Sequence, residues 1–126
     1  MSNIVDKNKQ SWNEGASAYA ALIHSEKFMK RIIENPANAF HHTTWELIQK
    51  YVPNICGKKI CVPSSGDNHA VFAFAMLGAN VTSCDISENQ LANAKNIADQ
   101  YEWGKSIEFV CADTMRLDSI PDDIYD

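Results

Sequence analysis

The hydrophobic and polar positions of the first part of the chain follow a helical period. A first stretch is rich in alanine, a second has apolar residues on one face, and a third starts at Thr43 with Glu46 three residues on as a capping-box partner. Pro53 ends the third stretch, because proline cannot continue a helix. The sequence therefore predicts helices at residues 12–22, 26–34 and 43–52.

After Pro53 the pattern changes to short apolar runs separated by turn residues. Residues 59–62, 81–85 and 107–111 are predicted strands, and residues 70–77, which have no polar face, are a predicted helix covered on most sides. Ser87 with Gln90 forms a second helix-start box. Strands that alternate with helices predict a parallel sheet with right-handed crossovers. The expected fold class is α/β: a Rossmann-like three-layer parallel sheet, preceded by N-terminal helices.

The last residues, from Ile120 to Asp126, have the pattern of the approach to a fourth strand. In a doubly wound sheet of order 3-2-1-4 the fourth strand lies beside the first, so without it the first strand keeps an open edge. We expect one truncated domain over residues 1–126, with a helical cover at 1–53 and a Rossmann-like βαβαβ unit at 54–126. A homodimer through the first-strand edge is one way to cover that edge.

Composition and charge exclude several classes of function. The 126 residues are 45% hydrophobic, which is enough for one packed core. The net charge is −5 and the basic residues are scattered, so no nucleic-acid surface is expected. The N-terminus lacks the apolar core of a signal peptide, and the longest apolar run, at 70–79, is about half the length that spans a bilayer. We expect a soluble cytoplasmic protein with no membrane partner.

The metal-binding residue types form no recognisable metal site. The four cysteines, Cys56, Cys61, Cys84 and Cys111, contain no CxxC pair, so we expect reduced, mostly buried thiols. His41 and His42 are adjacent, and neighbouring residues cannot share one helix face. No metal is therefore expected.

The most informative segment, residues 58–85, is a strand, a polar turn around Gly66, an apolar helix and a second strand that ends in Asp85. Such a turn can receive an anionic group at the start of the following helix, and the later acid can accept ribose hydroxyls. The sequence therefore predicts a nucleoside-type ligand.

These residues resemble the N-terminal half of a class I S-adenosylmethionine-dependent methyltransferase. The turn VPSSGDN corresponds to the glycine-rich turn D-x-G-x-G-x-G of that family but keeps only its middle glycine, Gly66. The segments VTSCDISENQLANAK and IEFVCADTMRL resemble the second strand with its acid and helix start, and the third strand with its acidic turn. Ser64 and Asn68 stand where the family has glycines, and Val62 stands at its frequent acid.

The resemblance implies S-adenosylmethionine as cofactor, S-adenosylhomocysteine as product, and a methyl acceptor that the sequence does not identify. The implied contacts are Asp85 to the ribose, Ile86 to the adenine face, Asp113 with Thr114 to the adenine amino group, and Ser64, Gly66 and Asn68 to the methionine end. Trp12 and Tyr19 fall in a segment that resembles the helix covering the cofactor.

Methyl transfer needs no dedicated nucleophile, so no catalytic residue is assigned, and weak or no activity is expected of these residues alone. Two alternatives remain open. The first is a non-catalytic Rossmann-like interaction module whose altered turn no longer binds. The second is an NAD-dependent oxidoreductase domain, which fits less well because His69 stands where the third glycine of G-x-G-x-x-G allows close packing.

Overall fold

The structure of the protein is a computed structural model. It describes residues 3–23, 26–65, 68–113 and 124–126, with the backbone alone at residues 3, 17–23 and 26. Among these residues, no helix is long and apolar enough to cross a membrane.

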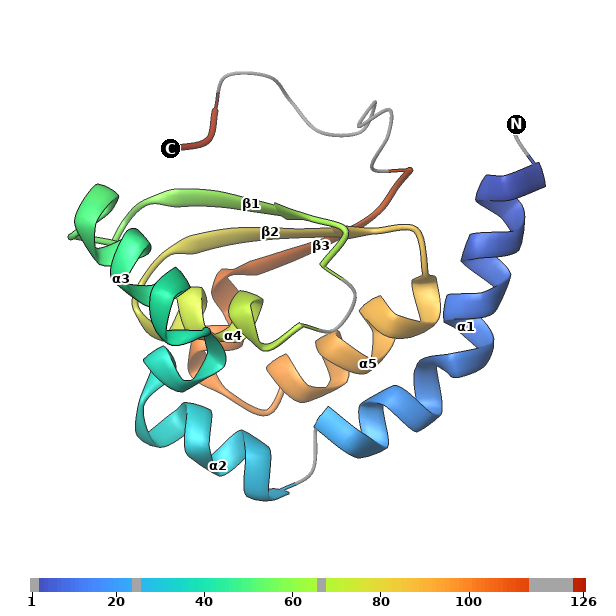
Figure 1. Cartoon of the computed structure of the whole chain (residues 1–126), viewed down its shortest axis with the longest axis horizontal. Helices are drawn as coiled ribbons and strands as arrows, with labels where there is room; N and C mark the ends of the chain where they lie inside the picture. The colour runs from blue at the N-terminus through green and yellow to red at the C-terminus, as the bar shows by residue number, and fades with distance from the viewer. Residues whose placement is uncertain (1–2, 24–25, 66–67, 114–123) are drawn as a thin grey trace.

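The core of the fold is a parallel sheet of three strands. The strands are β1 (Lys59–Pro63), β2 (Asn80–Asp85) and β3 (Ile107–Cys111), and β2 lies in the middle. Val81 pairs with Ile60 on one side and with Ile107 on the other, so apolar residues of the three strands lie in one row. This arrangement confirms the predicted α/β fold and the 3-2-1 part of the predicted strand order (Figure 1).

Two helices cover one face of this sheet. Helix α4 (His69–Met76) connects β1 to β2, and α5 (Glu88–Ala98) connects β2 to β3. The apolar composition of α4 matches its burial, because Val71, Phe72 and Ala73 are all fully enclosed. Gly78 ends α4 with a φ of 95°, which a residue without a Cβ adopts readily. The hydrophobic core therefore lies between the sheet and these two helices.

The N-terminal elements pack around the same helical layer. They are α1 (Asn3–Ile23), α2 (Glu26–Glu34), η1 (Pro36–Ala39) and α3 (His42–Tyr51). A further short helix, η2 (Glu102–Ser106), lies later in the chain and precedes β3. Figure 1 shows α2 below the sheet together with α4 and α5, and α3 at the left, beside the ends where the strands begin, while α1 runs past the side where the strands end. Helix α1 begins at Asn3, well before the predicted start at Trp12, because the polar residues that precede Trp12 are also compatible with a helix.

The start of α3 differs from the prediction. The N-cap is His41, whose Nδ1 accepts the backbone N–H of Thr43 at 3.3 Å. Thr43 therefore lies inside the helix, and its capping box with Glu46 does not form. The helix-start box at Ser87 is half right, since Ser87 caps α5 by accepting the Gln90 N–H at 3.3 Å. The N–H of Ser87 donates instead to Asp85, so Gln90 does not complete the box.

The outer edge of β1 meets the last residue of the sequence. Asp126 donates its N–H to the carbonyl of Lys59 at 2.7 Å, and its carboxylate accepts the Lys59 N–H at 2.8 Å. Both groups of Lys59 point away from β2, so Asp126 stands where a strand beside β1 would begin. The adjacent face of the sheet carries an open groove of about 460 Å³, which includes Thr82, Val110 and Tyr125.

Candidate functional site

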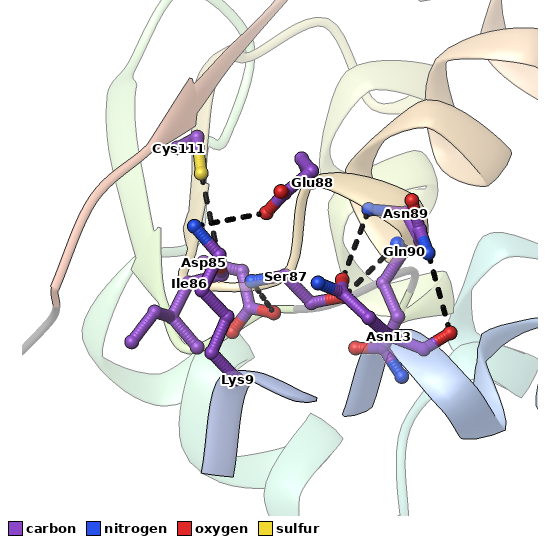
Figure 2. Close-up of polar contacts among 9 residues, drawn as sticks. All are labelled: Lys9, Asn13, Asp85, Ile86, Ser87, Glu88, Asn89, Gln90 and Cys111. Atoms are coloured by element: carbon purple, nitrogen blue, oxygen red, sulfur yellow. Dashed lines mark hydrogen bonds and ion pairs between the residues drawn. The ribbon is translucent and has the colours of Figure 1, made fainter. Parts of the chain in front are cut away.

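Asp85 is the acidic residue at the carboxyl end of β2. The residue is 8% exposed, and its Oδ2 accepts the backbone N–H of Ser87 at 3.3 Å (Figure 2). Asp85 pairs in register with Cys111, the last residue of β3. The carboxylate is therefore held in one orientation where two parallel strands end side by side.

The turn after β1 reaches the same edge of the sheet. Ser64 has a φ of 54°, in the left-handed region that favours glycine. Ser65 is buried, and its hydroxyl oxygen lies 2.6 Å from that of Ser83 in β2. The N–H of Ser65 also donates to the carbonyl of Cys84 at 3.0 Å. The turn is therefore tied to β2 just before Asp85, while Gly66, the predicted contact of the ligand, lies outside the described residues.

Asn68 begins α4 and closes the turn. Its Oδ1 accepts the N–H of Ala70 at 2.8 Å, which makes it the N-cap, and its own N–H donates to the carbonyl of Ser65 at 3.0 Å. The start of α4 thus follows the turn directly, as the sequence predicted. The Asn68 side-chain oxygen already has a partner within the protein.

Ile86 and Asp113 lie at the ends of β2 and β3. The Ile86 carbonyl accepts a hydrogen bond from the Cys111 thiol at 3.5 Å, and the Ala112 N–H donates to the Asp85 carbonyl at 2.9 Å. Asp113 follows at once and is half-buried. The structure thus brings Asp85, Ile86 and Asp113 to one edge, whereas Thr114 lies outside the described residues.

Helix α1 carries the two residues that were predicted to cover the ligand, Trp12 and Tyr19, and two residues near the site that were not predicted. Trp12 is 53% exposed, and Tyr19 belongs to α1 through its backbone, with its side chain outside the description. The described residues of α1 that contact the start of α5, next to the end of β2, are Lys9 and Asn13 instead. Lys9 pairs with Glu88 at 3.1 Å, and the Oδ1 of Asn13 accepts the Ser87 hydroxyl at 2.6 Å (Figure 2).

The polar residues that support the site were not predicted from the sequence. Asn13, Ser65 and Ser83 were not selected, although a serine inside an apolar strand was a usable signal for Ser83, because a buried hydroxyl requires a partner. Asn13 carried no such signal, since asparagine in a helix is usually exposed.

Lys9 of α1 and Glu88 at the start of α5 shift each other's pKa. The pKa of Glu88 is lowered, first by its own backbone N–H and then by Lys9, and the pKa of Lys9 is raised, mainly by its hydrogen bond to Glu88. Both side chains are substantially exposed, so this pair adds little stability.

The cysteines are free thiols, as predicted, but they are not mostly buried. Only Cys84 is fully enclosed, and burial raises its pKa. Cys61 is half-buried, whereas Cys56 and Cys111 are exposed, because Cys56 lies in the turn before β1 and Cys111 is the last residue of β3. Within the described part of the chain, no group of three or more histidines, cysteines or acids could hold a metal ion.

The comparison with protein families identifies the class. The family described as methyltransferase domain matches residues 63–126, about half of the chain, from the end of β1 through β3 to Asp126. The chain belongs to this methyltransferase domain family, which confirms the resemblance seen in the sequence. A comparison with curated proteins gave no match.

Proposed function

We propose that the chain binds S-adenosylmethionine at the carboxyl edge of its sheet and forms the cofactor-binding portion of a methyltransferase. The methyl acceptor is unidentified. Membership of the methyltransferase domain family supports the reaction class, since the matched residues contain the turn, Asp85 and Asp113.

The observation that carries this proposal is the position of Asp85. A carboxylate at the end of a middle strand, with one oxygen held by the Ser87 N–H, is suited to accept both hydroxyls of a ribose. In this proposal Ile86 gives the adenine ring an apolar face, and Asp113 with Thr114 contacts its amino group. In the sequence, all of these positions are at or just after the carboxyl ends of β2 and β3, where ligands bind in open α/β sheets.

The methionine end of the cofactor is assigned to the turn and to α4. The left-handed φ of Ser64 preserves the backbone path that glycine favours, although a serine occupies the position. The N-terminal N–H groups of α4, which begins at His69, suit a carboxylate. Ser64, Gly66 and Asn68 are therefore the proposed contacts, with Trp12 and Tyr19 of α1 covering this end.

The chemistry requires alignment more than a reactive side chain. When bound, S-adenosylmethionine supplies a methyl group attached to a positively charged sulfur. The sulfur is a good leaving group, because it departs as the neutral thioether. The protein then has to hold donor and acceptor in line and to exclude water. We assign no catalytic residue, and we expect these 126 residues alone to have weak or no transferase activity.

Calorimetric titration with S-adenosylhomocysteine tests the proposal. The wild-type chain should bind, Asp85→Asn should bind much more weakly, and NAD should give no heat. Asp99→Asn is the matched control, because Asp99 forms an exposed ion pair with Lys95 at the far end of α5. A folded wild-type chain that gives no heat at millimolar ligand would refute the proposal.

A non-catalytic interaction module is the second candidate. Two observations favour it: the side-chain oxygen of Asn68 is already used as a helix cap, and an open groove lies on the face of the sheet opposite α4. In that case the chain should give no heat with S-adenosylhomocysteine and should sediment as a dimer. Dimerisation through the β1 edge should then be lost when Cys61, at the centre of β1, is replaced by proline, which removes a backbone donor.

A further inference from the structure

The part of α1 whose side chains the structure describes, residues 4–16, contacts α5 through residues spaced along one helix face. Lys9, Asn13 and Ala16 follow an i, i+4, i+7 spacing, so they face the same way. Lys9 pairs with Glu88, and the carbonyl of Ala16 accepts the Asn93 side chain at 3.4 Å. Between them, Asn13 meets both Ser87 and Asn89 (Figure 2).

Polar contacts dominate the part of this junction in which the structure describes the side chains of α1. Ala16 is the one buried side chain among those that the structure describes in α1, and the hydrophobic core cluster includes none of them. Exposed ion pairs and hydrogen bonds of this kind hold a helix only weakly. The contact of Asn13 with the buried Ser87 is the exception, because Ser87 is fully enclosed.

Ser87 connects this junction to Asp85. Its hydroxyl donates to the Oδ1 of Asn13 at 2.6 Å, while its backbone N–H donates to the Oδ2 of Asp85 at 3.3 Å. Figure 2 shows the three residues in a row, from α1 through the start of α5 to the end of β2. The orientation of Ser87 is therefore fixed from both sides.

We propose that Asn13 is a positioning residue for nucleoside binding, acting through Ser87 on the Asp85 carboxylate. Docking of α1 orients Ser87, and Ser87 in turn holds the carboxylate in the conformation that accepts a ribose diol. By linkage, a ligand that binds this carboxylate also stabilises the docked α1. This inference rests on the proposed binding of S-adenosylmethionine and adds a residue that the family turn and acid do not include.

Asn13→Ala and Asn8→Ala make a matched pair for the test. Both replace an asparagine of α1 by alanine, which raises the helix propensity, but Asn8 is exposed and lies off the contact face. In calorimetry with S-adenosylhomocysteine, Asn13→Ala should raise the Kd roughly three- to tenfold, the range for one lost hydrogen bond. Asn8→Ala should bind like the wild type.

Two further measurements separate positioning from simple support of the fold. Addition of S-adenosylhomocysteine should slow hydrogen exchange of the α1 amides in the wild type and do so less in Asn13→Ala. In a double-mutant cycle on the Kd, Asn13→Ala should add little to Ser87→Ala, because both break the same connection.

The outcomes are distinct. If the wild type does not bind S-adenosylhomocysteine, the proposed function fails, and this inference fails with it. If the wild type binds but Asn13→Ala has the Kd of Asn8→Ala, or if the ligand leaves α1 exchange unchanged, the positioning role alone is wrong.

Discussion

The hydroxyl oxygens of Ser65 and Ser83 lie 2.6 Å apart in the interior, joining the turn after β1 to the middle of β2. Ser65 also donates to the carbonyl of Cys84 at 3.3 Å. The turn after β1 is thus fixed against the neighbouring strand β2 by side chains as well as by the backbone. This connection sets the distance between the turn and Asp85.

Removal of this hydroxyl pair should destabilise the protein. Ser65→Ala should lower the free energy of unfolding by about 1–3 kcal/mol, because it leaves Ser83 without its partner. Urea denaturation measures the change. The double variant Ser65→Ala/Ser83→Ala should lower the free energy of unfolding by less than the sum of the two single variants, because each single variant already removes the same hydrogen bond. Ser106→Ala, at the end of η2, is the control and should leave the midpoint unchanged.

Ser64 has a left-handed backbone conformation, and its replacement by glycine should stabilise the protein. Ser64→Gly should raise the free energy of unfolding by about 1 kcal/mol, because glycine adopts a φ of 54° without the clash of a Cβ. Thermal or urea unfolding measures the gain. Ser64→Ala keeps the Cβ and removes the hydroxyl, so it should show no gain. A stabilised alanine variant would mean that the hydroxyl, not the backbone, is the source of the effect.

Gln90 is a buried amide at the junction of α1 and α5. Its Nε2 has no hydrogen-bond partner among the residues that the structure describes, and such a donor carries an uncompensated desolvation cost. Gln90→Met, of similar shape, should therefore raise the free energy of unfolding by about 1 kcal/mol. Gln49→Met on the exposed face of α3 is the comparison and should have little effect. Destabilisation by Gln90→Met would show that the amide is satisfied in solution.

The Lys9–Glu88 pair makes a prediction about pH. Because the pKa of Glu88 is lowered from its ordinary 4.5, its contribution is present above that pH and disappears as the pH falls through the lowered value. Because the pKa of Lys9 is raised from 10.5, its contribution is present below that pH and disappears as the pH rises through the raised value. The pair should therefore support α1 docking between these limits.

A nuclear magnetic resonance titration of the Glu88 carboxyl group checks this directly. Lys9→Ala should raise the pKa of Glu88 without restoring its ordinary value, because the Glu88 backbone N–H is the larger cause of the shift. Lys95→Ala, which breaks the ion pair with Asp99 on the same helix, should leave Glu88 unchanged. An unchanged pKa in Lys9→Ala would show that α1 does not dock here in solution.

The periodic parts of the fold could be predicted from the sequence, and the polar supports of the site could not. The residues of α4 are almost all apolar, and those of β2 form a short run that ends in Asp85. Such patterns are typical of a buried helix and a buried strand, so both elements could be predicted. The cap of α3 was misplaced because His41 and Thr43 both offer a side-chain acceptor, and only the three-dimensional path of the chain selects His41. Asn13 meets Ser87 across 74 positions of sequence, a pairing that no local pattern encodes.

The sparse docking of the first half of α1 has an evolutionary consequence. Substitutions there leave the interior of the sheet and its helices intact, provided that the positions of Lys9, Asn13 and Ala16 remain compatible with α5. Related proteins with the same sheet can therefore differ in the first half of α1 while the rest of the fold stays the same. Diversity among related proteins should concentrate in this segment, and transplanting it between them is a direct route to altered selectivity.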